Sequence, residues 1–216
     1  MSNTDFIFRD HDFTWAFSRV VEWNKVARDG KHIFDDKTIS FQKKLVEEET
    51  KELFDAIDAK DKVEALDALC DMFVVGSYWY FLQNKDNKPS SYIASIPLHG
   101  VDYVEAAKFD IEQDSSYFFM MSVTSMLLKF EGNVKGALEE VLSSNDSKFP
   151  LVQDSDALAS PEDTCRWIES ENEGRYTGVT AKIIGKGKDK RYVFLDNNGK
   201  IMKPKTFFKP NLTKFV

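Results

Sequence analysis

Acidic side chains recur at helical spacing in two neighbouring stretches of the sequence, and carboxylates grouped in this way can bind a cation or transfer a proton. The acids are Glu48, Glu49, Glu52, Glu64, Asp67 and Asp71. On a helical wheel, Glu49 and Glu52 fall within about 40° of Leu45, on the stripe that Phe41 also occupies. Burying an ionised carboxylate is costly unless the group is paired or binds a metal, so acids on an apolar face require an explanation.

Two helices joined by a short turn would bring these acids together. Residues 40–60 and 63–82 each carry apolar side chains at helical spacing, and a polar turn around residues 59–62 separates them. Packed antiparallel, the two helices would gather four acids: Glu49, Glu52, Glu64 and Asp67.

Like charges at that density need compensation, and a hard cation bound by oxygen ligands supplies it. We therefore expect Mg²⁺ as the cofactor, with Mn²⁺ as a substitute, and no softer metal, because no histidine or cysteine joins the group. The alternative is a solvated helix face, on which the acids pair with nearby lysines: Lys43, Lys44 and Lys51.

The remaining pattern predicts a mainly α helical bundle with a small β-containing C-terminal extension. Further helices are expected over residues 13–28, 117–130 and 134–142. Residues 83–100 are expected to form a loop, and residues 149–175 an irregular segment. The β-prone runs at 178–184 and 191–195, separated by Gly185-Lys-Gly-Lys, predict a hairpin. The predicted domains are thus a core at 1–148, and an extension at 149–216 packed on it.

Composition limits the classes of function. The 216 residues carry 29 Lys and Arg against 36 Asp and Glu, a net charge of −7, which has the wrong sign for a duplex-binding protein unless something cationic mediates. Cys70 and Cys165 share no disulfide or zinc spacing, and the first twenty residues hold no signal peptide. We expect a cytoplasmic protein, in the host cytoplasm if viral, with no nucleic-acid and no membrane partner.

The acidic segments resemble a known family. Leu45-Val-Glu-Glu-Glu-Thr-Lys-Glu-Leu53 followed by Glu64-Ala-Leu-Asp67 resembles the ExxE...ExxD signature of the MazG-like all-α nucleoside triphosphate pyrophosphohydrolases, including the phage and bacterial phosphoribosyl-ATP pyrophosphohydrolase-like members. The segment from Asp67 to Asp71 and Gly76 resembles their D-A-L-x-D helix, which ends in glycine. Later pieces are similar to an S-N-x-S-K segment and a closing tail: Ser144–Lys148, Gly199–Pro204 and Lys209–Leu212.

The resemblance implies the roles of individual residues. By analogy, the metal ligands would be Glu49, Glu52, Glu64 and Asp67, with Asp71 assisting or replacing Asp67 and Glu48 acting as a base. Substrate phosphates would be held by Asn145 and Lys148, with Lys200 and Lys203 as helpers from the tail. Exposed solubilising lysines and an Asn in a helix-ending turn are the structural alternatives. Residues 83–116 would be an insertion in the family's core.

The implied enzyme converts a nucleoside triphosphate to the monophosphate and pyrophosphate, as a homodimer or homotetramer. Analogy favours deoxynucleotides, dGTP or dATP, over phosphoribosyl-ATP or dUTP. Candidates for stacking on the base are Trp23, Trp79 and Tyr80, although aromatic residues at helical spacing usually belong to a core. The alternative of a different class is a non-catalytic protein of the same fold that binds a nucleotide or a protein.

Overall fold

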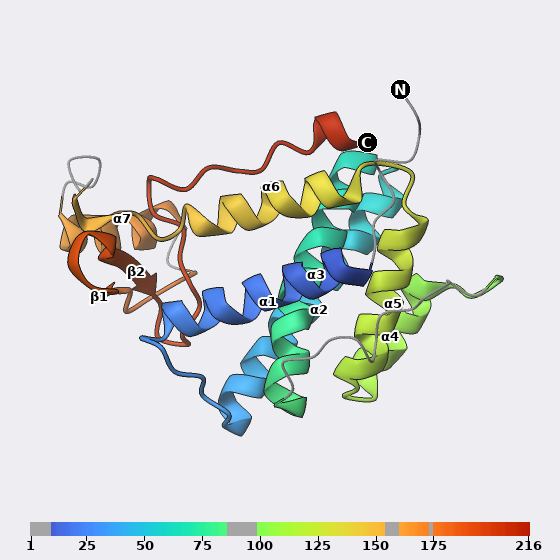
Figure 1. Cartoon of the computed structure of the whole chain (residues 1–216), viewed down its shortest axis with the longest axis horizontal. Coiled ribbons are helices and arrows are strands. Elements are labelled where there is room, and N and C mark those ends of the chain that lie inside the picture. Colours follow the sequence, from blue (N-terminus) through green and yellow to red (C-terminus); the bar gives the residue numbers. More distant parts are fainter. Residues whose placement is uncertain (1–9, 86–98, 154–159, 173–174) are drawn as a thin grey trace. The chain divides into compact units, whose positions relative to one another are not determined.

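The chain forms two compact units in a computed structural model, which describes residues 10–85, 99–153, 160–172 and 175–216 (Figure 1). The helical unit comprises Met1–Glu22, Ile33–Leu142 and Asn211–Val216. The sheet unit comprises Trp23–His32 and Ser143–Pro210. Each unit draws on separate parts of the sequence, whereas the predicted domains, 1–148 and 149–216, are continuous. That division into a core and an extension stays a prediction.

Within the described residues lie seven α-helices and one two-stranded sheet, which confirms the mainly α fold class. The helices are α1 (Asp10–Ala27), α2 (Asp36–Asp58), α3 (Lys62–Asn84), α4 (Tyr103–Glu112), α5 (Ser116–Lys129), α6 (Val134–Asp146) and α7 (Pro161–Glu171). The strands are β1 (Thr180–Ile184) and β2 (Arg191–Leu195). A short 3-10 helix, Gly187–Asp189, lies between them, and another, Thr213–Phe215, lies near the C-terminus.

Helices α2 and α3 form the predicted antiparallel pair (Figure 1). Asp35 and Asp61 cap their N-termini, because each side chain accepts a hydrogen bond from backbone N–H groups of the first turn. Between the helices, Lys60 adopts a left-handed φ of 56°, which reverses the chain. The amide of Gln42 donates a hydrogen bond to the carbonyl oxygen of Val75 at 2.8 Å and ties the two helices together.

Helix α3 is the buried centre of the helical unit, and Gly76 lies inside it. The helix expected over residues 63–82 includes this position, whereas the resemblance to a family helix that ends in glycine does not hold here. A Cβ atom at Gly76 would lie 2.6 Å from Cε1 of Phe119 and 2.7 Å from the sulfur of Met120, so α3 and α5 approach each other there more closely than any side chain permits. The glycine serves packing.

By length and composition alone α3 could cross a membrane. Within the described part of the chain, however, 78% of its most apolar window is buried inside the protein. A core helix of a folded unit has this property, so the hydropathy of α3 is weak evidence for a span.

The predicted insertion at 83–116 contains helix α4, which belongs to the core of the helical unit. Ala107 and Ile111 are buried there, and Oγ of Ser122 in α5 donates a hydrogen bond to Asp110 at 3.0 Å. The predicted loop at 83–100 is wrong at its start, since residues 83 and 84 continue α3, and its middle, 86–98, lies outside the described residues.

The sheet unit is built around the hairpin of β1 and β2, which pair antiparallel as predicted, Ala181 with Phe194 and Ile183 with Tyr192. Two apolar clusters cover the strands. One contains Ala27, Phe149, Ile184, Val193 and Leu195; the other contains Ile168, Val179, Phe194 and Met202.

The prediction of an irregular segment over 149–175 is wrong, because α7 occupies Pro161–Glu171. Oγ of Ser160 accepts the N–H of Asp163 at 3.0 Å, Pro161 opens the first turn, and two acids follow it. This is a standard helix-start pattern, and it could have been recognised from the sequence.

Candidate functional site

Helix α2 presents its predicted acids at the edge of its buried face. Val46, Thr50 and Leu53 are buried, and Glu49, which follows the same stripe, is half-buried. Glu48 and Glu52 are exposed. The wheel argument is thus confirmed for Glu49, whereas Glu52 lies farther toward solvent than the apolar stripe predicts.

Helix α3 carries its three acids on one stripe, within about 60° of one another on the helical wheel. Asp67 and Asp71 are half-buried and Glu64 is exposed. The register set by the Gln42–Val75 hydrogen bond and the short turn places Glu49 level with the turn that contains Asp67 and Asp71, and Glu52 one turn nearer Glu64. We call these six acids the carboxylate seam: Glu48, Glu49, Glu52, Glu64, Asp67 and Asp71.

Two oxygens of the carboxylate seam are shielded from solvent, Oε2 of Glu49 and Oδ1 of Asp67. Cys70, also buried, stands beside them. Burial raises the pKa of the Cys70 thiol well above its usual range, and the nearby charges of Asp71 and Asp67 raise it further. The donors that the seam itself offers are carboxylate oxygens, an all-oxygen donor set.

This donor set suits a hard cation chemically, but its side chains are not gathered around one point. Among the residues that the structure describes, no three His, Cys, Asp or Glu side chains lie close enough together to hold a metal ion. Glu52 and Glu64 are exposed at helix surfaces, where a change of rotamer moves a carboxylate by several ångströms. The seam is thus a set of donors on two fixed helices rather than a formed cage.

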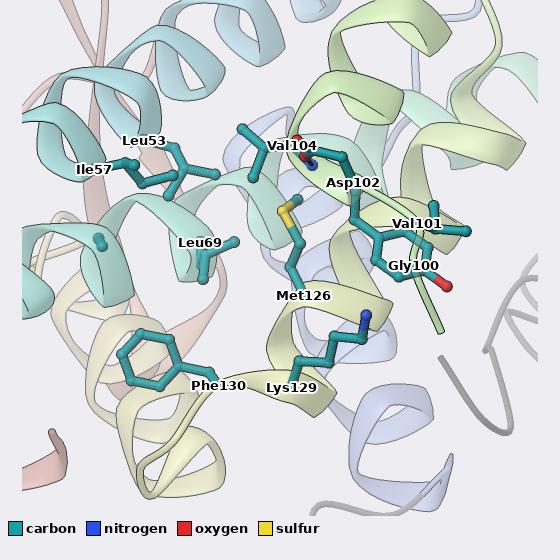
Figure 2. A pocket seen from close by; sticks show the side chains of 12 residues that line it. Leu53, Ile57, Leu69, Gly100, Val101, Asp102, Val104, Met126, Lys129 and Phe130 are labelled. Atoms are coloured by element: carbon teal, nitrogen blue, oxygen red, sulfur yellow. Dashed lines mark hydrogen bonds between the residues drawn. The ribbon is translucent and has the colours of Figure 1, made fainter. Parts of the chain in front are cut away.

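An apolar pocket of about 630 Å³ opens elsewhere in the helical unit, and none of the six acids lines it. Figure 2 shows Leu53, Ile57 and Leu69 along one side, with Lys129 and Phe130 facing them. On α3, about 140° to 160° of rotation separates Leu69 from the acids, so the pocket and the carboxylate seam lie on different faces of the helix. The pocket is not the predicted hydrolytic site.

The predicted phosphate-binding residues all belong to the sheet unit. Lys148 lies with Nζ 2.5 Å from Oδ1 of Asn145 and 5.6 Å from the ring centre of Trp23. The indole N–H of Trp23 donates to the carbonyl oxygen of Asn145 at 3.2 Å, and its ring stacks on Phe149 at 4.9 Å. The structure therefore brings Asn145 and Lys148 together, beside an aromatic pair, at the end of α6.

Lys200 and Lys203 lie against aromatic rings of the same unit. Nζ of Lys200 is 5.2 Å from the ring centre of Tyr176, and Nζ of Lys203 is 4.8 Å from that of Phe207. Lys148 also lies over Phe207, at 5.7 Å, so Lys148 and Lys203 share one ring. These contacts place the three ammonium groups over aromatic rings.

Two of the predicted base-stacking residues are core residues. Trp79 and Tyr80 are buried in the helical unit, where Trp79 meets Phe119 edge to face and Tyr80 meets Phe17. Trp79 and Tyr80 therefore belong to the core, which is the usual place of aromatic residues at helical spacing. Trp23 is half-buried and remains a candidate.

Comparison with known proteins adds a family match. Residues 17–84 match the family described as phosphoribosyl-ATP pyrophosphohydrolase. The matched segment includes all of α2 and α3 and therefore the whole carboxylate seam. No curated protein matches the chain, and no solved structure does. The family match indicates a pyrophosphohydrolase that acts on a nucleotide-type substrate.

Proposed function

We propose that the chain is a Mg²⁺-dependent enzyme that cleaves a nucleoside triphosphate to the monophosphate and pyrophosphate. The proposal starts from residues 17–84, which match the phosphoribosyl-ATP pyrophosphohydrolase family of the MazG-like all-α superfamily. The observation that carries the proposal is the carboxylate seam. Six acids sit on two helices held in register, and carboxylates from both helices have an oxygen removed from solvent. Removing a carboxylate oxygen from water costs free energy, and a bound cation would offset this cost.

In this proposal Glu49, Glu52, Glu64 and Asp67 hold Mg²⁺, and Asp71 assists Asp67. The bound cation would offset the charge of the phosphates and lower the pKa of water. Glu48 is exposed and accepts the proton of the water that attacks phosphorus. The bond between the α- and β-phosphates breaks, and pyrophosphate leaves.

Asn145 and Lys148 are proposed to bind phosphate oxygens through the amide N–H₂ and the ammonium group, and the ammonium group of Lys148 already donates to Oδ1 of the same amide. Lys203, which shares the Phe207 ring with Lys148, adds a second cation. Lys200 is the more distant helper, since its contact is with Tyr176. Trp23 offers an aromatic surface beside Lys148 for a base.

The substrate is best identified by a panel of purified nucleotides. Deoxynucleotides, dGTP and dATP first, are our proposed substrates, and the panel must also contain ribonucleotides, dUTP and phosphoribosyl-ATP. Pyrophosphate and monophosphate should appear in equal amounts, and only when Mg²⁺ or Mn²⁺ is present. Release of inorganic phosphate instead would contradict cleavage between the α- and β-phosphates.

A matched pair of variants ties the activity to the seam. Glu52→Gln removes one carboxylate from the seam, whereas Glu47→Gln makes the same change on the same helix at an exposed position pointing elsewhere. We expect pyrophosphate release to fall at least about 100-fold in the first and to be retained in the second. If every nucleotide binds and none is hydrolysed by the wild type, the chain is the non-catalytic binding protein of this fold.

A further inference from the structure

The turn of the β-hairpin concentrates positive charge. Between Lys182 and Arg191 the chain carries Lys182, Lys186, Lys188, Lys190 and Arg191 against a single acid, Asp189. We call residues 182–191 the basic hairpin. Its four lysines are fully exposed, and Arg191 is half-buried.

These lysines differ from five lysines of the helical unit, each of which pairs with an acid. There, Lys43 pairs with Asp114 at 3.1 Å, and Lys135 pairs with Asp12 at 3.1 Å. Lys51, Lys62 and Lys214 also pair with acids. Among the described residues, none of the four hairpin lysines forms an ion pair. Their charge is therefore directed at solvent or at a ligand.

The backbone holds the basic hairpin in a fixed shape. Gly185 and Gly187 take left-handed φ angles of 79° and 60°, and a Cβ atom at Gly185 would lie 2.7 Å from the carbonyl oxygen of Asp189. Arg191 anchors the second strand, because its guanidinium donates to the carbonyl oxygen of Phe149 at 2.7 Å. The lysines thus project from a braced turn, which lowers the entropy lost when a ligand binds.

Charge is divided unevenly between the two units of the chain. The sheet unit holds 15 Lys and Arg and 11 Asp and Glu, a net charge of +4, which leaves 14 and 25, a net charge of −11, for the helical unit. At physiological salt the Debye length is about 8 Å, so a ligand at the hairpin responds to the charges within that distance rather than to the net −7 of the chain. The net charge of the whole chain argues against binding of a polyanion, but it does not decide whether a polyanion binds at this turn.

An apolar surface accompanies the cations. Ile183 is 54% exposed, although it lies in the strand between Lys182 and the turn. It pairs across the hairpin with Tyr192, which is half-buried, so a branched side chain and an aromatic ring lie on one face of the sheet. Phosphates bind lysines while unpaired bases stack on rings and apolar groups, a combination that suits a single strand better than a duplex.

We propose that the basic hairpin, Lys182 to Arg191 with the Ile183–Tyr192 face, binds single-stranded nucleic acid. The assignment is independent of the carboxylate seam, which belongs to the helical unit. A lipid surface is less well matched, because the hairpin offers one strongly exposed large apolar side chain, Ile183, for insertion.

Fluorescence anisotropy with a labelled oligo(dT) strand of about twenty nucleotides tests the proposal on the full-length chain at low salt. We expect binding with a steep salt dependence. The variant K186Q/K188Q/K190Q should bind at least about ten-fold more weakly, and its slope of log K against log salt should be smaller by about 2, since each lost contact to a single strand contributes about 0.7. Ile183→Ala should weaken binding without changing the salt slope.

The matched control is K37Q/K60Q/K108Q, which changes the net charge equally at exposed positions of the helical unit. It should bind the strand within about two-fold of the wild type. Absence of binding at low salt, or an equal loss in the control, would overturn the proposal. So would tighter binding to phosphatidylserine vesicles than to oligo(dT), which would assign the hairpin to membranes. A raised KM for nucleotides in the hairpin variant, with oligo(dT) displaced by millimolar triphosphate, would assign it to substrate capture instead.

Discussion

The carboxylate seam places six acids on two neighbouring helices. Glu49 and Asp67 each keep one oxygen away from water, and Asp71 lies one turn from Asp67 on the same helix. Ionised carboxylates this close repel each other, and burial removes the water that would moderate the repulsion. A bound divalent cation would replace this repulsion between carboxylates by attraction to the cation. The stability of the folded protein and metal binding should therefore be linked at these residues.

Asp67→Asn tests that linkage. Without Mg²⁺ the variant should be as stable as the wild type or more so, because one of the repelling charges is gone. With saturating Mg²⁺ the wild type should gain about 1–3 kcal/mol, seen as a higher melting temperature, and the variant should lose most of this gain. Thermal melts in MgCl₂ and in NaCl of equal ionic strength measure it. An equal Mg²⁺ effect in both proteins would exclude Asp67 as a ligand.

Adjacent residues of α3 have opposite expected effects when changed to alanine. Gly76→Ala adds a methyl group against Phe119 and Met120, both buried, and Phe119 is held in turn by Trp79. Overpacking costs about 1–3 kcal/mol, which outweighs the helix propensity of about 1 kcal/mol that alanine adds. We therefore expect a lower free energy of unfolding in urea.

Ser77→Ala should instead be neutral or stabilising. The Oγ atom of Ser77 is buried and has no hydrogen-bond partner among the described residues, so its removal relieves an unsatisfied polar group. Urea unfolding of both alanine variants supplies the comparison. A strongly destabilised Ser77→Ala would show that this hydroxyl has a partner after all.

Asp110 makes the contact between α4 and α5 dependent on pH. Burial raises the pKa of its carboxyl, and the hydrogen bond from Ser122 lowers that pKa by a smaller amount. Because the folded-state pKa exceeds the unfolded value, the stabilising contribution is fully present in acid and is lost as the pH rises through the folded pKa. Asp110→Asn should therefore melt slightly higher than the wild type at neutral pH, and the two should converge below about pH 4. Melting curves with the same difference at both pH values would contradict this.

At the scale of elements, the sequence predicted those helices and strands whose formation depends on a local pattern of residues. Apolar spacing located α1, α2 and α3, and β-branched runs located the hairpin. It placed Gly76 inside the helix expected over residues 63–82 but did not predict its packing role, because the close approach of Phe119 from α5 is a long-range contact. Helix α7 was not predicted, although Ser160 and Pro161 form a local helix-start pattern, because the polar composition of the segment was taken as a sign of irregular structure.

At the scale of the whole molecule, the sequence predicted which acids share the α2–α3 pair but not how far each is buried. Glu52 and Glu64 are exposed, and no three described side chains gather as metal ligands do. Side-chain positions at a helix surface depend on rotamers and on bound ions, neither of which follows from periodicity. The phosphate-binding residues come from a different unit than the seam, so their joint role, like the oligomeric state, stays a prediction.

The most direct test of the account is the initial rate of pyrophosphate release by wild type, Glu52→Gln and Glu47→Gln with the best nucleotide of the panel and Mg²⁺. The account predicts release by the wild type and by Glu47→Gln, and a loss of at least about 100-fold in Glu52→Gln, whose melting temperature without Mg²⁺ should not be lowered. Equal rates in all three proteins would contradict it, because the carboxylate seam would then not be where the nucleotide is cleaved.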